Sequence, residues 1–520
     1  MSAVSGGTLY GDSRVLYLDY TPTSYPFTVH FESITESANT AHIPSWWPVS
    51  GYQSSTQKSS YIINYNPELG FRFKYTNTDE RVNIVESSNK FTVSVQNFEA
   101  VLAEVHSPAF NKLVPNVLFA LDNFELEGVP GMASDWKTFG KWVNDYLLQG
   151  TQALPQQTHN EVKQLVANIN DPIEKARKIY SYVQNKTRYI SVQVGIGGWK
   201  PMLAQDVDRL GYGDCKALTN YTKALLQVAE IPSYYTILYG GAKRDIQKDF
   251  SSLQGNHVIL AIPKDEDYVW LECTSQEIPF GYLGDFTDDR DVLVVTPEGG
   301  QIAHTLSYKN EVNSLKASGS YTINSTGTIQ AQYNCDTGGM QYDQKYGLST
   351  QTEKERIDHY KEYWSYLKNI EILDLEITND KEQVSFSEAI NFTASEYATF
   401  AGDEMLVTLN AFNRSTYLPE RDSDRQFDII WKTGFVDDDD LIIEIPTDFE
   451  IKYLPEDITF QSDFGSYTVA VEKITDNQIN YKRQFKMNEG KYPKESYKAL
   501  RTFLKKVNKA DNTKMILTKK

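Results

Sequence analysis

Short runs of aromatic and β-branched side chains alternate with Ser, Gly, Asn and Pro breaks over about the first 120 residues. Such runs are typical of β-strands that bury one face. We therefore expect a β-sandwich-like domain over residues 1–133. Because a strand is expected as early as residue 14, we also expect this domain to lack its first strands. The expected strands lie at residues 14–20, 27–33, 60–65, 71–75 and 91–95.

From about residue 134, apolar side chains recur at helical spacing, which predicts amphipathic helices. One helix is expected over residues 136–148. A capping box formed by Thr158 and Glu161 predicts the start of a second helix. Asp171 and Pro172 predict the start of another, because Asp caps a helix and Pro suits its first position.

A further helix begins near Cys215 and ends before Pro232. Three strands are expected after it, at residues 234–239, 257–262 and 268–273. Helices followed by strands on one core are typical of an α+β domain. We assign this α+β domain to residues 134–305.

From about residue 306 the β-type pattern returns and predicts a β-rich C-terminal domain over residues 306–520. A helical insert is expected at residues 352–368, and an amphipathic helix at residues 494–507 closes the domain. Together the three predicted domains make an α+β multidomain protein. The expected C-terminal strands lie at residues 319–323, 328–333, 383–392, 441–445 and 466–471.

Four consecutive acids, Asp437, Asp438, Asp439 and Asp440, precede the strand expected at residues 441–445. A calcium loop is one interpretation, but the spacing fits no EF-hand. Charge runs of this kind are usually solvated, so we expect a solvent-exposed turn here.

The composition is acidic, with 51 Lys and Arg against 69 Asp and Glu and a formal net charge of −18. Sequence-independent binding of nucleic acid requires basic patches, so nucleic acid is not expected as a partner. No stretch approaches 18 consecutive apolar residues, so no transmembrane segment is expected. The first residues have neither a basic region nor an apolar core, so the sequence as it stands shows no signal peptide.

Three cysteines, Cys215, Cys273 and Cys335, do not make a disulfide framework, and their odd number leaves at least one thiol free. No closely spaced pair of Cys or His residues is present, so a zinc site is not expected. Cys273 and Cys335 have no motif around them and are interpreted as structural.

Cys215 is the candidate nucleophile. Asp214 is a good N-cap, which places Cys215 at the first position of a helix, where the positive end of the helix dipole favours a thiolate. Gly211 and Gly213 keep the approach open for a substrate. The backbone N–H of Cys215 can also serve as one oxyanion donor.

His257 and Glu272 complete a candidate triad of a thiol, an imidazole and an acid. If residues 263–266 form a four-residue hairpin loop, His257 and Glu272 lie directly opposite each other on adjacent strands. A carboxylate in that place would fix the tautomer of the imidazole and support its charged form.

Each of these residues also has a structural interpretation. A cysteine at a helix start is more often a small buried side chain than a nucleophile, and a lone strand glutamate is usually solvated. The joint pattern favours catalysis, because a capped cysteine is followed by a histidine and an acid in register.

Several stretches around these residues resemble the bacterial transglutaminase-like superfamily, which has a papain-like core. The flanks resemble multidomain envelope proteins with an uncharacterised β-rich domain on each side, on DSRV at 12–15 and YPKESY at 492–497. The central stretches are RYIS at 188–191, GIGGWKP at 195–201, GYGDCKAL at 211–218, NHV at 256–258, VWLECTS at 269–275 and PFGYL at 279–283.

The resemblance implies that Cys215 is the nucleophile, His257 the general base and Glu272 the orienting acid, with no cofactor and no metal. Glu272 departs from the Asp that the family usually carries, which implies weaker support for His257. Family members are usually exported, so a periplasmic or exported protein is expected. The absence of a signal then suggests a truncated sequence or a misplaced start codon.

The implied activity is thiol acyl transfer on a peptide or carboxamide bond of a protein or peptide substrate. Water as acceptor would make a peptidase or amidase, and an amine would make a transglutaminase. Trp199 would line the cleft together with Gly213 and Asp214, or Trp199 is a packed core residue. The alternative is a non-catalytic binding or scaffold protein with a degenerate core. The sequence does not specify the oligomeric state.

Overall fold

The computed structural model describes residues 8–11, 17 and 19–520. The chain divides into two compact units, one of residues 1–101 and 110–307 and the other of residues 102–109 and 308–520. The domain boundaries expected after residues 133 and 305 stay predictions.

No helix among the described residues has the length and apolar character needed to cross a membrane.

The first part of the first unit consists of small antiparallel sheets. The strands β2, β5 and β4 form one sheet in that order, β3 pairs with β6, and β7 pairs with β8. Phe91, Val93 and Val95 on β5 are fully buried because alternate residues of a strand face the same side. The strands expected at residues 60–65, 71–75 and 91–95 are confirmed. The bounds are β2 Thr56–Asn64, β3 Phe71–Thr76, β4 Asn83–Ser87, β5 Lys90–Phe98, β6 Asn116–Leu121, β7 Asn123–Leu126 and β8 Val129–Met132.

Two expected N-terminal strands are not found. Residues 27–33 form no strand, so that prediction was wrong: the aromatic Phe31 is 84% exposed and the segment has no strand to pair with among the described residues. A run of apolar side chains makes a strand only where a partner strand and a buried face exist. The strand expected at residues 14–20 lies largely outside the described residues. The strand β1, Thr8–Gly11, pairs in parallel with β10, Ser191–Gln193.

Arg72, on β3, ties the β-rich part to the loops of the part that follows. Its Nε donates to Asp122 at 2.6 Å, and its Nη2 donates to the carbonyl oxygens of Ala133 and Ser251 at 2.5 and 2.9 Å. Ser251 belongs to the loop that runs into His257. The β-rich part therefore contacts a loop of the α+β part through a hydrogen bond to its backbone.

The α+β part contains the helices that the periodicity predicts. Asp171 accepts hydrogen bonds from the amides of Ile173 and Glu174, which confirms it as the cap of α3. The helix expected over residues 136–148 continues past α1 as a π-helix, labelled η3. The bounds are α1 Trp136–Trp142, η3 Val143–Leu148, α2 Gln156–Val166, α3 Pro172–Lys186, α4 Ala204–Leu210 and α5 Cys215–Val228.

The expected capping box at Thr158 is wrong. The helix α2 begins at Gln156, after Pro155, so Thr158 lies inside its first turn. Its hydroxyl donates instead to the carboxylate of Asp208 at 2.8 Å. A tertiary hydrogen bond has replaced the local cap that the sequence suggests.

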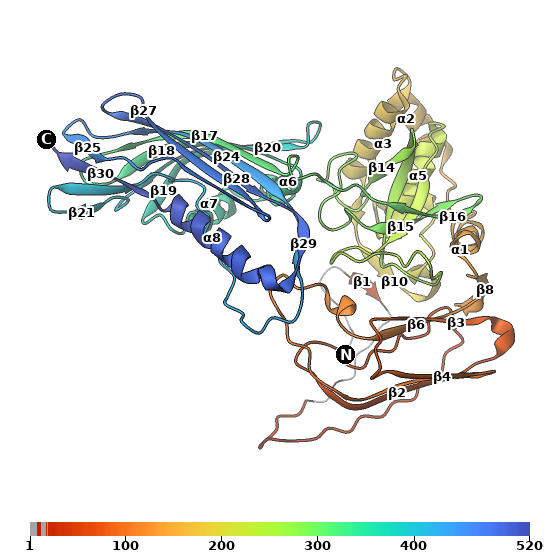
Figure 1. The fold of residues 1–520 in the computed structure, drawn as a ribbon. Coiled ribbons are helices and arrows are strands. Elements are labelled where there is room, and N and C mark those ends of the chain that lie inside the picture. Colours follow the sequence, from red (N-terminus) through yellow and green to blue (C-terminus); the bar gives the residue numbers. More distant parts are fainter. Residues whose placement is uncertain (1–7, 12–16, 18) are drawn as a thin grey trace. The chain divides into compact units, whose positions relative to one another are not determined.

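A five-stranded sheet completes the α+β part, in the order β14-β13-β12-β15-β16. The helix α5 contacts β13 of this sheet, and α2 and α3 pack against α5 (Figure 1). The strands expected at residues 234–239, 257–262 and 268–273 are confirmed, with different ends. The bounds are β12 Tyr234–Leu238, β13 His257–Lys264, β14 Asp267–Leu271, β15 Asp291–Thr296 and β16 Gly299–His304, and the two-residue strands β9 Arg188–Tyr189 and β11 Tyr212–Gly213 pair in parallel beside it.

An eight-stranded sheet dominates the second unit, in the order β19-β20-β18-β17-β24-β28-β27-β26. The helix α8 runs along this sheet (Figure 1), and its Phe503 packs against Phe485 of β28. The five strands expected here, the helical insert and the last helix are confirmed within these elements. The bounds are β17 Ser314–Ile323, β18 Ile329–Gly338, β19 Ile370–Asp380, β20 Ser385–Ala394, β24 Phe435–Glu444, β26 Ile458–Ser462, β27 Gly465–Lys473, β28 Gln478–Met487, α6 Met340–Asp343, α7 Glu353–Tyr363 and α8 Tyr497–Asp511.

Two smaller sheets accompany it. A four-stranded sheet has the order β21-β22-β30-β25, and β23 pairs with β29. The last strand, β30, therefore follows the helix that the sequence places near the end of the chain. The bounds are β21 Thr399–Ala401, β22 Glu404–Thr408, β23 Ile429–Trp431, β25 Phe449–Tyr453, β29 Gly490–Tyr492 and β30 Lys514–Lys519.

The four consecutive acids do not form a turn, so that prediction was wrong. They lie within β24, paired with β17 and β28, and Asp439 is buried. Arg483 on β28 donates to Asp439 at 2.8 Å and to Asp511 at 2.7 Å, all three being buried. A buried arginine between two carboxylates allows an acid to face the core, which charge patterning alone does not reveal.

We predict that Arg483→Met destabilises the second unit by about 3–5 kcal/mol, because it leaves two carboxylates buried without their cation. Denaturant unfolding of the full chain gives the free energy, and hydrogen exchange of peptides from β24 and β28 locates the effect. Lys482→Met is the control, since the pair of Lys482 with Asp440 is more than half exposed and such pairs contribute about 0–1 kcal/mol. Equal effects of the two substitutions would contradict the prediction.

Candidate active site

Cys215 is the first residue of α5. The carboxylate of Asp214 accepts from the amide of Ala217 at 3.0 Å, and its carbonyl accepts from Leu218 at 2.9 Å, so Asp214 caps the helix as expected. The other carboxylate oxygen of Asp214 accepts from Lys216, and both side chains are buried. The thiol thus lies at the positive end of a 14-residue helix.

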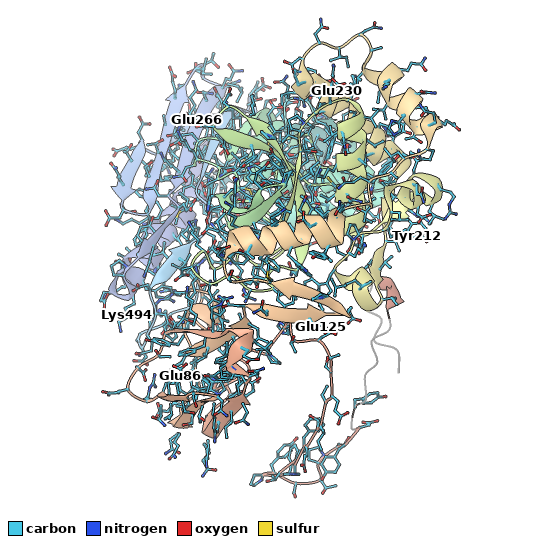
Figure 2. The ribbon with its side chains drawn as sticks, turned by 90° about the vertical axis from the view of Figure 1, so that its right-hand side faces the viewer. Glu86, Glu125, Tyr212, Glu230, Glu266 and Lys494 are labelled. Carbon is cyan, nitrogen blue, oxygen red and sulfur yellow. The ribbon has the colours of Figure 1, made fainter. Side chains whose placement is uncertain are left out.

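Two glycines shape the approach to Cys215. Gly211 ends α4 with φ 71°, a left-handed conformation that glycine adopts without strain. A Cβ on Gly213 would come within 2.6 Å of the Cβ of Ala217, so this glycine allows the chain to pass close to the first turn of α5. Tyr212, which lies between them on β11, is labelled in Figure 2.

His257 begins β13 and its imidazole is buried. Its backbone is paired with Leu238, and the neighbouring Asn256 accepts from the amide of Gly240 at 2.6 Å. The ring of Phe286 meets the imidazole edge-on, with 5.1 Å between the ring centroids. These contacts fix the ring at the end of the strand.

Glu272 is hydrogen-bonded to the imidazole of His257. Its Oε2 lies 2.8 Å from Nε2 of His257, and its Oε1 accepts from the amide and hydroxyl of Thr274 at 3.0 and 2.6 Å. The hydroxyl of Tyr180 donates to the backbone carbonyl of Glu272 at 2.6 Å. Because Nε2 is engaged with Glu272, Nδ1 is the ring nitrogen left for the thiol.

The register that we expected for this hairpin is wrong by two residues. Asp265 adopts φ 54°, so a two-residue turn joins Lys264 to Asp267, its partner in the ladder; Glu266 in Figure 2 marks this turn. Pro263 remains within β13, because it lies beyond Ala261, where the ladder with β12 ends. A two-residue shift keeps every side chain on its face, so Glu272 reaches His257 diagonally rather than from the directly opposite position.

The electrostatics of the site stabilise a charged imidazole. Burial alone would disfavour the charge, but the carboxylate of Glu272 and the thiol of Cys215 outweigh it and raise the pKa of His257 to about 10. Burial likewise opposes the charge of Glu272, yet His257 and Thr274 lower the pKa of its carboxyl. Both groups therefore carry their charges at neutral pH.

Cys215 and His257 face the same cavity of about 290 Å³. Trp199 also lines this cavity and is half-buried, whereas Gly213 and Asp214 are not part of the lining. Trp199 thus lies where a cleft residue would lie, while the other two residues act on the position of the thiol.

Sequence reasoning missed several residues of the site: Thr274, Tyr180, Phe286, Tyr235 and Lys216. The Thr that follows Glu272 by two residues is a usable signal, since Ser and Thr often bond carboxylates and backbone nearby. Tyr180 and Phe286 come from elements distant in sequence, and no local pattern connects them with Cys215.

The two other cysteines have unreactive surroundings. All three thiols are buried and free of disulfides. Burial raises the pKa of Cys273 to about 12 and holds the pKa of Cys335 well above its ordinary value. Both are packed side chains, as the sequence suggests.

Comparisons with known proteins give matches to two family models. Residues 160–280 match the model of the transglutaminase-like superfamily, and residues 403–517 match a domain of unknown function that has a solved structure, DUF3858. No curated protein matches the chain.

Two solved structures are similar to the chain. A crystal structure of a protein from Parabacteroides distasonis, named as a candidate protease, has a TM-score of 0.55 and 12% identity over 92% of this chain and 76% of that chain. A candidate cysteine protease from Cytophaga hutchinsonii matches 45% of this chain and 73% of its own at 11% identity, with a TM-score of 0.20. The first likeness shows a shared fold.

We predict that brief alkylation near about pH 6 modifies Cys215 well before the other thiols, because it alone combines a helix N-terminus with an imidazolium. Peptide mapping by mass spectrometry after different times gives the three rates. The control is His257→Gln, in which the rate at Cys215 should fall while those at Cys273 and Cys335 stay low. Faster modification of Cys273 or Cys335 would contradict the assignment.

A second prediction concerns pH. Because the folded pKa of His257 lies above the unfolded value of about 6.5, its contribution to stability is complete below that pH and disappears as pH rises towards 10. The loss of unfolding free energy in Glu272→Gln should therefore be larger at pH 6 than at pH 10, by roughly 2 kcal/mol. Glu266→Gln, at the exposed turn of the same hairpin, should show no such trend.

Proposed function

We propose that this chain, whose residues 160–280 form a transglutaminase-like domain, is a thiol acyl-transfer enzyme that hydrolyses peptide or carboxamide bonds. The observation that carries the proposal is the buried His257–Glu272 pair beside a cysteine at a helix N-terminus. The same three residue types serve as nucleophile, base and orienting acid in cysteine peptidases.

The first half of the reaction forms a thioester. The proton of the thiol resides on His257, whose charge Glu272 supports, so the sulfur attacks as a thiolate. Sγ of Cys215 bonds to the carbonyl carbon, and the backbone N–H of Cys215 donates to the oxyanion. The C–N bond then breaks as His257 transfers its proton to the leaving amine.

The second half releases the acyl group. Neutral His257 takes a proton from water, whose oxygen bonds to the thioester carbon. The C–S bond breaks, a carboxylic acid leaves, and the thiolate regains its imidazolium partner. An amine in place of water would give a transglutaminase product. We favour hydrolysis by analogy with bacterial relatives of this core, and for the same reason we propose that the protein acts in the cell envelope.

The competing proposal is a binding protein with an inactive core. Incubation of the full chain with a peptide library, with and without an added primary amine, separates the three outcomes by mass spectrometry. Shortened peptides support a peptidase, amine adducts support a transferase, and unchanged peptides together with an unreactive Cys215 support a binding protein.

We predict that Cys215→Ala and His257→Ala reduce peptide cleavage to background, because each removes a group that makes or breaks a bond. Circular dichroism of both variants should match that of the parent chain. Lys223→Ala, on α5 but outside the cavity lining, is the control and should retain activity. Residual cleavage by Cys215→Ala would assign the activity to another residue.

Substitutions of the acid should rank as parent, then Glu272→Asp, then Glu272→Gln. The amide removes the charge and should cost on the order of 10⁴ in kcat, as loss of a triad acid does elsewhere. The resemblance implies weaker support for His257 from a glutamate, but the 2.8 Å contact with Nε2 is made by the longer side chain. Aspartate keeps the charge but is one methylene too short for that contact, so we expect an intermediate rate. The pH profile of kcat should shift to lower pH in Glu272→Gln only, and unchanged kcat in that variant would leave a catalytic dyad.

A further inference from the structure

The cavity beside Cys215 is lined mainly by apolar side chains. Part of its lining, the α1 wall, comes from α1 and the π-helix η3, and part comes from β12 and the loop before β13. Cys215 and His257 also line the cavity. The apolar side chains that define its shape are Phe139, Trp142, Leu147, Trp199, Ile237 and Leu253.

The α1 wall lies outside residues 160–280, which match the superfamily model. Its position is fixed in two ways. The indole of Trp142 donates to the carbonyl of Pro130 at 2.9 Å, and a Cβ on Gly140 would come within 2.2 Å of Gly300 on β16. The wall continues through η3, and π-helical turns are frequent at functional sites.

Most polar side chains that line the cavity are already engaged. Lys216 is paired with Asp214, and both are buried. Gln254 hydrogen-bonds to backbone groups at both ends of its side chain, and Asn256 binds the backbone of Gly240. These groups therefore have little capacity to recognise a polar substrate group.

Tyr235 also lines the cavity. Burial and the nearby charge of Cys215 hold the pKa of this phenol well above its ordinary value, so it stays neutral. A neutral phenol adds one hydrogen-bonding group and no charge to an otherwise apolar chamber.

We propose that this cavity is a specificity pocket that receives a bulky apolar side chain on the acyl side of the scissile bond. The proposal rests on the proposed acyl-transfer function and names its substrate class: peptides with an aromatic or large aliphatic residue next to the bond that Cys215 attacks. Binding of that side chain would bring the adjacent carbonyl carbon to the thiolate, because Cys215 lines the same cavity.

The size and chemistry of the cavity fit such a side chain. An engineered apolar cavity of about 150 Å³ stays dry and binds benzene. The present cavity, at about 290 Å³, has room for a phenyl or indole group. Apolar walls offer water no hydrogen bonds, so the cavity favours an apolar side chain as its ligand.

The test compares two alkylating reagents on the full chain: iodoacetamide and N-benzyl iodoacetamide. Each forms a bond from Sγ of Cys215 to the methylene carbon as iodide leaves, so the reagents differ only in the apolar group. Rates at Cys215 are divided by those of N-acetylcysteine under the same conditions. We expect the benzyl reagent to be favoured by roughly tenfold or more, as burial of an aromatic group allows.

Leu253 provides the variant because it lies on a loop and is half-buried, so a larger side chain there should not prevent folding. Leu253→Trp should narrow the pocket and abolish the preference for the benzyl reagent. Leu253→Ala should keep or increase it. Leu203→Trp, at an exposed leucine before α4 that does not line the cavity, should leave the ratio of the two rates unchanged.

The outcomes separate the two proposals. Failure of both reagents to modify Cys215 overturns the proposed function and the pocket with it. Rapid modification by iodoacetamide without a benzyl preference overturns the pocket alone. A benzyl preference that survives Leu253→Trp also overturns the pocket, because the apolar group would then bind elsewhere.

Discussion

The buried ion pair of His257 and Glu272 is the interaction on which the candidate site depends. Removing two charged groups from water costs free energy unless each is well paired and hydrogen-bonded. Glu272 meets that condition with one oxygen on the imidazole and the other on Thr274. Tyr180 on α3 holds the backbone of Glu272, so the helical layer and the sheet both contribute to the charge state of His257.

The thiol of Cys215 is positioned by local interactions that are separate from those of the His257–Glu272 pair. The cap at Asp214 and the glycine at 213 set the first turn of α5, whereas the sheet sets the imidazole. The contact of α5 with β13 then joins the two halves. Cys215 on α5 and His257 on β13 both line the apolar cavity, so the reacting groups and the pocket are built from the same helix and sheet.

How well the sequence predicted each feature depended on how far apart in sequence the interacting residues lie. The caps at Asp171 and Asp214 depend on neighbouring residues, and both were predicted. The register of the β13–β14 hairpin was not, because the positive φ of Asp265 made a two-residue turn where four residues were expected. The burial of Asp439 and the hydroxyl contact of Thr158 depend on partners distant in sequence, Arg483 and Asp208, that no local pattern identifies.

The hydrogen bonds of Arg72 have a consequence for how this architecture could evolve. Its guanidinium, on the β-rich part, donates to the backbone carbonyl of Ala133 and to that of Ser251, which lies in the loop before His257. The α+β part is therefore not an interchangeable module. A recombination event that joined it to another N-terminal partner would remove the arginine that donates to the carbonyl of Ser251, so these two segments are expected to be inherited together.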